Sequence, residues 1–164
     1  MFSIGDIIFY PVFGAGYILN IEEKEICGEI KKYYIMKFLL NDMNMMIPIE
    51  SVVGRRIRRA ISPDECEKVL NIIKSNPVKL SSKWSKRCKH YTQSIRSGDI
   101  FLLASIIRDI AGLYRTRSLS KSEAKVFMDI VDMVAGEISL VTNRDLNSVK
   151  KEILNKVNMN EFLC

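Results

Sequence analysis

The chain of 164 residues is 48% hydrophobic and 27% charged, with a formal net charge of +6 at pH 7. This composition allows a hydrophobic core and excludes a disordered chain, and the length suits one ordinary domain or two small ones. No apolar run approaches the ~20 residues that a membrane-spanning helix requires. The start, MFSIGDIIFY, lacks the basic segment and cleavage site of a secretion signal. We therefore expect a cytoplasmic protein without a membrane segment.

The first fifty residues have the pattern of β-strands. The segments DIIFYPVFGAGYILNI, KKYYIMKFLL and MNMMIPIESVV are rich in β-branched and aromatic residues. Turns are expected at residues 27–28 and 41–42, and Pro48 favours an edge or the end of a strand. Short strands with turns at this spacing predict a small antiparallel β-barrel over residues 1–53.

Residues 54–61, GRRIRRAI, hold four arginines and no compact apolar pattern. We interpret this segment as a charged linker. Strands before it and helical patterns after it predict an α+β protein of two domains, residues 1–53 and 62–164.

The helical part begins with a clear start signal. Ser62 can cap a first helix, with Pro63 at the first helical position and Glu65 closing a capping box. A second helix is expected from about Ser82 to Ser97. Caps for the remaining helices are expected at Asp99, at Ser120 with Glu123 as a second capping box, and at Asn143. These signals predict a bundle of five helices.

The positive charge is concentrated in one segment. Residues 54–98 contain 12 Lys/Arg and 3 Asp/Glu, whereas residues 1–53 contain 4 and 7, and residues 99–164 contain 9 of each. Such asymmetry indicates a polyanion or an acidic protein surface as the partner.

The only tryptophan lies within this basic segment. Trp84, Cys88, Tyr91 and Ile95 have the spacing of a buried helical stripe, so packing in the bundle is one interpretation. Trp84 also falls in the first turn of its helix, where a side chain can project beyond the end of the bundle. Sequence alone leaves both interpretations open.

The cations around the indole favour the second interpretation. Lys83, Lys86 and Arg87 occupy a helix start, where the helix dipole disfavours positive charge by ~0.3–1 kcal/mol each. In contrast, acidic residues lie near the starts of other predicted helices: Asp64 and Glu65, Glu123, and Asp145. Phosphates would offset this cost, and an indole among them could stack on a base or wedge between base steps. The candidate DNA-binding residues are Trp84, Lys83, Lys86, Arg87 and Lys89.

Signatures of enzymes and metal sites are missing from the sequence. His90 is the single histidine, Gly14-Ala-Gly16 is half of a dinucleotide motif at best, and no P-loop, zinc-protease or calcium-loop motif is present. The four cysteines, including Cys164, have no C-x-x-C spacing and are expected to be free, mostly buried thiols. We expect no catalytic activity, no cofactor and no metal.

Several short motifs, taken in order along the chain, resemble the CarD-type bacterial transcription regulators. GDIIFYPVFGAG is similar to the opening of that family, and KEICGEIKKYYIMK to its hairpin. KWSKR resembles its Trp-Ser-basic-basic motif, followed by SGDI, IIRDI and LSKSE at matching spacing. The resemblance covers essentially the whole chain.

The resemblance implies a Tudor- or SH3-like barrel that binds the RNA polymerase β subunit and a helical domain on promoter DNA. In the family, the tryptophan at the position of Trp84 wedges into the minor groove at the upstream edge of the transcription bubble and slows collapse of the open complex. Lys86 and Lys89 match phosphate-contacting positions. The implied location is the cytoplasm, with the nucleoid reached through the polymerase.

The polymerase-binding residues implied by the family are Lys24, Met46 and Pro48. Lys24 matches a basic polymerase-contacting position, and Pro48 matches a proline that follows the hairpin. Met46 departs from the family, which often has a basic residue there, so contact at this position would be apolar. Cys88 also departs, since an aromatic residue is common at its position.

The leading hypothesis is therefore a non-enzymatic, monomeric transcription regulator that bridges polymerase and DNA. One alternative is an RNA- or ribosome-associated adaptor that uses the same basic face, although a single aromatic is sparse for reading single-stranded RNA. Another is a protein-binding scaffold whose basic segment meets an acidic partner.

Overall fold

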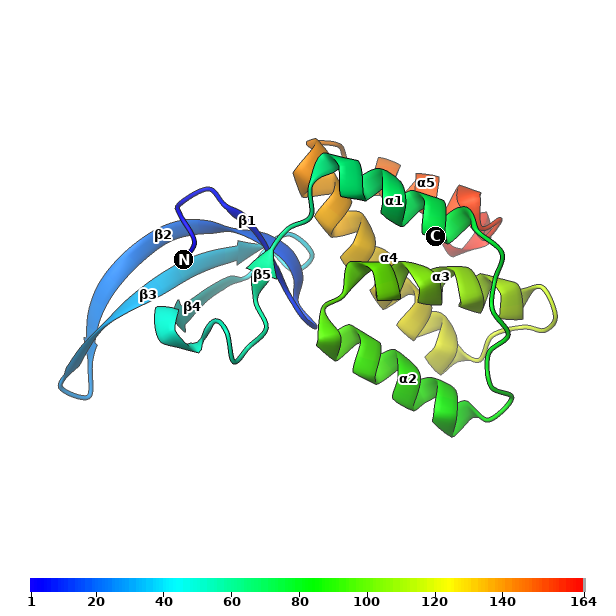
Figure 1. The fold of residues 1–164 in the computed structure, drawn as a ribbon, viewed down its shortest axis with the longest axis horizontal. Helices are drawn as coiled ribbons and strands as arrows, with labels where there is room; N and C mark the ends of the chain where they lie inside the picture. Colours follow the sequence, from blue (N-terminus) through cyan, green and yellow to red (C-terminus); the bar gives the residue numbers. More distant parts are fainter. Residues whose placement is uncertain (164) are drawn as a thin grey trace.

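The computed structural model describes residues 1–163, which form an antiparallel sheet followed by a group of helices (Figure 1). The strands are β1 (Ile7–Tyr10), β2 (Gly14–Ile26), β3 (Glu29–Phe38), β4 (Asn44–Pro48) and β5 (Arg58–Arg59), with a short 3-10 helix, η1, at Ile49–Ser51. The helices are α1 (Pro63–Lys74), α2 (Trp84–Ser97), α3 (Ile100–Tyr114), α4 (Lys121–Thr142) and α5 (Leu146–Lys156), followed by η2 (Asn160–Leu163). The prediction of an α+β protein with a β part before a helical part is confirmed.

The sheet is open, which corrects the predicted barrel. Its strand order is β4-β3-β2-β1-β5, so β4 and β5 are edges and do not pair with each other. The long β2–β3 hairpin turns at Cys27 and Gly28, whose φ angles of 55° and 79° are those of a tight hairpin turn. One face of the sheet carries its own apolar core, which includes Ile18, Tyr34 and Met36.

The predicted linker, residues 54–61, contains the last strand of the sheet. Arg58 and Arg59 form β5 and pair with Phe9 and Ile8 of β1, while Ile57 is buried in the core of the sheet. The sequence did not predict this strand because four arginines in eight residues usually indicate a solvated connector. Here one of them, Arg58, forms an ion pair with a buried carboxylate inside the protein.

That arginine joins the sheet to the helices. The Arg58 guanidinium donates to both carboxylate oxygens of Glu137 in α4, at 2.6 and 3.0 Å, and to the carbonyl of Gly98 at 2.8 and 3.0 Å. Glu137 is fully buried and also accepts from the backbone N–H of Ile61. The guanidinium lies 4.5 Å from the centre of the Phe9 ring, and Phe9 belongs to the core of the helical part. Sheet and helices therefore share a buried contact.

The helix caps follow the sequence in part. Ser62 forms the predicted capping box with Glu65, and Asp99 caps α3 as predicted. The predicted cap at Asn143 is wrong: this residue has a φ of 52° and ends α4, while Asp145 caps α5. Left-handed backbone suits asparagine, which explains why a helix end resembled a helix start.

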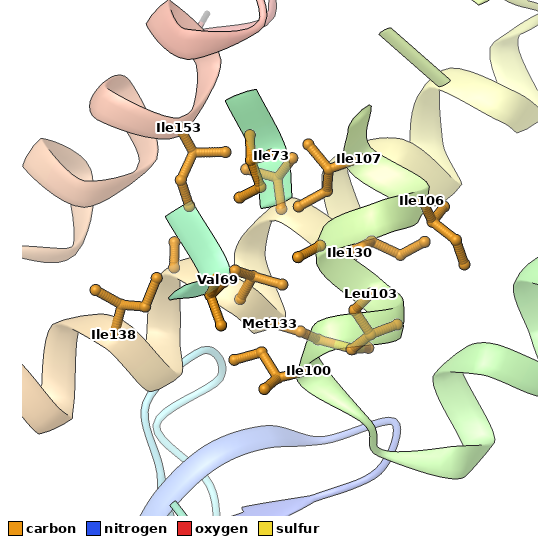
Figure 2. Packing of buried hydrophobic residues seen from close by; sticks show 14 of the residues in the cluster. Val69, Ile73, Ile100, Leu103, Ile106, Ile107, Ile130, Met133, Ile138 and Ile153 are labelled. Carbon is orange, nitrogen blue, oxygen red and sulfur yellow. The ribbon is translucent and has the colours of Figure 1, made fainter. Parts of the chain in front are cut away.

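The long helix α4 forms the centre of the helical core (Figure 2). Its middle residues are buried because α1, α3 and α5 and strand β2 all pack against it. Figure 2 shows the inward side chains of Val69 and Ile73 from α1, Leu103 and Ile107 from α3, Ile130 and Ile138 from α4, and Ile153 from α5. Within residues 1–163, no helix is both long enough and apolar enough to cross a membrane.

Candidate nucleic-acid interface and protein-docking face

The start of α2 differs from the other helix starts. Side chains cap four helices: Ser62 caps α1, Asp99 caps α3, Ser120 caps α4 and Asp145 caps α5. The cap position of α2 is Lys83, whose side chain makes no capping hydrogen bond, and its first turn has no acidic residue. The N–H groups of this turn therefore face outward with the positive end of the helix dipole, an arrangement that favours an anion.

The Trp84 side chain is the first of the helix and is 39% exposed. One edge packs against Tyr91, with ring centres 6.5 Å apart and a near-perpendicular arrangement. Of the predicted buried stripe, Tyr91 is buried, Cys88 and Ile95 are half-buried, and Trp84 is exposed, so the stripe is confirmed only in part. The indole lies at its outer end, where one side is supported and the other is open to solvent.

The Arg87 guanidinium lies beneath the indole, 5.6 Å from the ring centre. Only 6% of Arg87 is exposed, which corrects its prediction as a DNA-contacting cation. Its Nε donates to Glu123 at 2.8 Å, and its Nη1 donates to the carbonyls of Ser81 and Ser82 at 2.9 and 3.0 Å. With a further bond from Nη2 to Glu123, these bonds use four of the five N–H donors of the guanidinium. Arg87 therefore supports the indole from the interior and does not belong to the exposed basic surface.

Glu123 is the acceptor at the centre of this support. Its carboxylate is fully buried and accepts from Arg87, from the Tyr91 hydroxyl at 3.1 Å and from Arg117 at 3.1 Å. Burial alone would raise the pKa of Glu123, but the hydrogen bonds from Arg87, Arg117 and Tyr91 together lower that pKa below its usual value. Burial and the neighbouring Glu123 charge raise the pKa of Tyr91. The carboxylate is therefore ionised and the phenol is neutral at pH 7.

Sequence reasoning missed this support because it assigned Glu123 to a capping box. Ser120 does accept from the Glu123 N–H at 3.2 Å, but the carboxylate turns inward and does not return to the cap. The capping motif predicts where α4 begins, but it does not predict which way the Glu123 carboxylate points. That direction is set by Arg87, a buried partner on α2.

The remaining predicted cations lie at the same end of α2 as the indole. Lys83 and Lys86 belong to the first turn with Trp84, and Lys89 lies one turn further along. All three lysines are exposed, and none forms an ion pair with any residue between 1 and 163. The first two turns of α2 thus carry an open indole and three lysines with no counter-charge among residues 1–163.

The predicted polymerase-binding residues lie on the sheet, on one face. The strand register pairs Lys24 with Lys31, Ile35 with Met46 and Tyr33 with Pro48. Side chains of directly opposed residues share a face, as do alternate residues along a strand. Lys24, Met46 and Pro48 therefore lie on the face opposite the sheet's own core, which we call the outer face.

This outer face combines apolar and charged groups. Met46 is 40% exposed on the edge strand β4, beside the half-buried Ile35. The Lys24 ammonium lies 3.1 Å from the Glu22 carboxylate, and both side chains are exposed. An exposed pair of this kind contributes little to stability, so its charges remain available to a partner.

No group of three or more His, Cys, Asp or Glu side chains between residues 1 and 163 could hold a metal ion. The described cysteines are free thiols: Cys27 is exposed, Cys66 is buried and Cys88 is intermediate. The exposure of Cys27 departs from the mostly buried thiols that we expected. Cys164 lies outside the described residues.

An open antiparallel sheet with a mixed outer face, joined to a helical part with a basic indole-bearing end, defines a two-part α+β protein with two distinct surfaces. Comparison with known families matches both parts: the CarD-like/TRCF RID domain over residues 2–61 and the CarD C-terminal domain over residues 68–154. A Bacillus subtilis protein named "Putative transcription factor YdeB" is 30% identical over 141 residues, which cover 86% of this chain and 92% of that protein. The chain belongs to the CarD family of transcription factors.

Proposed function

We propose that the protein is a non-enzymatic transcription regulator that bridges RNA polymerase and promoter DNA. The outer face of the sheet, with Lys24, Met46 and Pro48, binds the polymerase β subunit. The N-terminal end of α2 binds DNA at the upstream edge of the transcription bubble. The observation that carries the proposal is the 39% exposed indole of Trp84 at a helix start without a side-chain cap, where Lys83, Lys86 and Lys89 on the first two turns form no ion pair with residues 1–163.

The mechanism follows from how the indole is held. Arg87 and Tyr91 support one side of the ring, and Glu123 fixes both of them, so the ring is positioned before DNA arrives. Inserting an apolar ring between base steps from the minor groove costs a few kcal/mol of unstacking, which is lowest where the duplex already melts. Insertion at the bubble edge therefore opposes reannealing and slows collapse of the open complex.

The lysines supply affinity without sequence readout. Lys83, Lys86 and Lys89 bind phosphates, and the first-turn N–H groups of α2 add to this preference for anions. The pattern of α2 offers no set of side chains for reading base edges in the major groove. DNA binding is therefore weak and steep in salt, and it prefers sequences that deform or melt easily.

The match to the RID domain favours polymerase over a ribosomal partner. A pull-down that compares polymerase β fragments with ribosomal RNA tests this choice. We expect capture of the β fragment, reduced by Lys24→Glu. The matched control is Lys32→Glu, because Lys32 faces Glu23 on the other side of the same hairpin. Capture of ribosomal RNA without the β fragment would overturn the proposal.

The central experiment is the lifetime of promoter open complexes after a competitor challenge. Trp84→Ala is expected to keep the circular dichroism and cooperative melting of the wild type and to shorten this lifetime. Lys24→Glu is expected to lose the effect on lifetime through weaker polymerase binding, with unchanged affinity for DNA alone. If Trp84→Ala unfolds the helices and leaves the lifetime per folded molecule unchanged, the wedge is wrong.

A further inference from the structure

The outer side of α2 carries a stripe of polar side chains that the proposed wedge does not use. Ser85, Lys89, Thr92 and Arg96 follow the i, i+4, i+7, i+11 spacing of one helix face. All four are exposed, on the side away from the buried Arg87, Tyr91 and Ser94 of the same helix. Along this stripe, hydroxyls alternate with cations.

The stripe borders a shallow groove that begins at the indole. The groove is lined by Trp84, Ser85, Cys88, Lys89, Thr92, Gln93 and Arg96. None of these side chains is acidic, and the whole of α2 contains no Asp or Glu. Short side chains at Ser85, Cys88 and Thr92 leave room between the two cations.

The charges of the stripe are uncompensated within the described chain. Lys89 and Arg96 form no ion pair with any residue from 1 to 163. In contrast, every lysine of β2 and β3 is paired: Lys24 with Glu22, Lys31 with Glu29 and Glu50, Lys32 with Glu23, and Lys37 with Asp42. The lysines of β2 and β3 are therefore neutralised, whereas Lys89 and Arg96 on the exposed stripe of α2 have no counter-charge among residues 1–163.

We propose that this stripe binds the sugar-phosphate backbone of duplex DNA, which runs along α2 from Trp84 to Arg96. Lys89 and Arg96 contact phosphates, and the hydroxyls of Ser85 and Thr92 donate to phosphate oxygens between them. Cations and hydroxyls are the side chains that usually make such contacts, and they carry no sequence information. This inference rests on the proposed DNA-binding function and adds Arg96, Thr92 and Ser85 to its surface.

The fold gives this path a length and a direction. Twelve helical residues at 1.5 Å each span ~18 Å, which is long enough for a few successive phosphates of one strand. Trp84 lies at the end of α2 far from the sheet, and Gly98 at the other end packs against Pro11 in the β1–β2 turn (Figure 1). The DNA backbone therefore runs from the indole toward the sheet, the part of the molecule that docks on polymerase.

The test is the salt dependence of DNA affinity for the full chain. Fluorescence anisotropy with a labelled 30-base-pair duplex that contains a short central bubble gives the dissociation constant at several KCl concentrations. The logarithm of the association constant falls linearly with the logarithm of the salt concentration, and each lost phosphate contact makes this negative slope shallower by about 0.9. We expect Arg96→Ala to make this slope shallower by about that amount, Arg96→Gln to behave likewise and Arg96→Lys to retain the wild-type slope.

Two controls separate phosphate contact from general effects. Lys125→Ala removes a cation that is paired with Asp129 on α4, and we expect it to leave the slope unchanged. Thr92→Ala removes a neutral donor, so it should weaken binding at every salt concentration without changing the slope. Hydroxyl-radical footprinting should show protection of a few nucleotides of one strand on one side of the bubble edge, shortened by Arg96→Ala.

The outcomes distinguish the path along α2 from the wedge. If wild type binds and Trp84→Ala weakens binding, but Arg96→Ala leaves slope and footprint unchanged, this inference is wrong and the proposed function stands. If wild type shows no salt-dependent binding to the duplex, both fail. Tighter binding to single-stranded RNA of the same length would also overturn the assignment to duplex DNA.

Discussion

Replacing Glu123 by glutamine removes the single charge that organises the support beneath the indole. The Glu123 carboxylate is fully buried and accepts hydrogen bonds from three side chains: Arg87 and Tyr91 of α2, and Arg117 from the loop before α4. The substitution preserves shape but leaves the Arg87 guanidinium, only 6% exposed, without a counter-charge.

The expected loss of stability is large for one substitution. Removing one partner of a buried ion pair costs about 3–5 kcal/mol, because the other charge stays buried and unpaired. Arg87 keeps the carbonyls of Ser81 and Ser82 as acceptors, which favours the lower end of this range, ~3 kcal/mol. At roughly 2–4 °C per kcal/mol for a protein of this size, Tm should fall by ~6–12 °C.

Urea and thermal unfolding measure this loss, and the fluorescence of Trp84 reports on the site itself. The matched control is Asp129→Asn on the same helix, which breaks the exposed Lys125–Asp129 pair at 3.0 Å and should cost about 0.5 kcal/mol or less. If Glu123→Gln destabilises the protein no more than Asp129→Asn does, the buried pair does not hold the site together.

The same variant predicts a pH dependence. The pKa of Glu123 lies below its usual value in the folded protein, so the stability it contributes is present above the unfolded pKa and is lost as pH falls through the folded pKa. The difference between wild type and Glu123→Gln should be constant from about pH 6 to 8 and shrink below about pH 4. A difference that grows on acidification would contradict this sign.

Three further predictions concern the packing around the site and the join between its two parts. Gly98→Ala adds a Cβ at a φ of 70° and 2.8 Å from a neighbouring ring carbon, so we expect a loss of about 1–2 kcal/mol in urea unfolding. Arg58→Met leaves the buried Glu137 carboxylate unpaired and should cost ~3 kcal/mol, much of which the double change with Glu137→Leu should restore; equal losses in the single and double variants would refute this. Burial, and to a lesser degree the charges of nearby carboxylates, raises the pKa of Cys66 to about 11. Iodoacetamide at pH 8 should therefore modify the exposed Cys27 far faster than the buried Cys66, which peptide mass spectrometry would measure.

Local signals in the sequence predicted much of the fold. The Ser62 capping box, the Asp99 cap and the turn at Cys27-Gly28 all lie where the sequence predicted them, because each depends on residues within a few positions of one another. The α+β order of elements was also predictable, since strand and helix periods differ clearly along the chain.

The errors share one cause, which is contact with a distant segment. Residues 54–61 resembled a linker because their arginines are charged, but Arg58 meets Glu137, 79 residues further along the chain. Arg87 resembled an exposed cation in the sequence, but it is buried in an ion pair with Glu123, 36 residues further along the chain. Closure of the sheet into a barrel likewise requires that the edge strands β4 and β5 pair with each other, and no local sequence pattern predicts that pairing.

The sequence alone determined the chemistry available to the site: one indole, a run of lysines beside it and a helix start that lacks an acidic cap. Tertiary structure decided how each of these groups is used, since it buried Arg87 beneath the ring, left Lys83, Lys86 and Lys89 in solvent and supported one side of Trp84. The physical reason is that spacing along a helix fixes which residues share a face, whereas the burial of that face depends on the elements that pack against it.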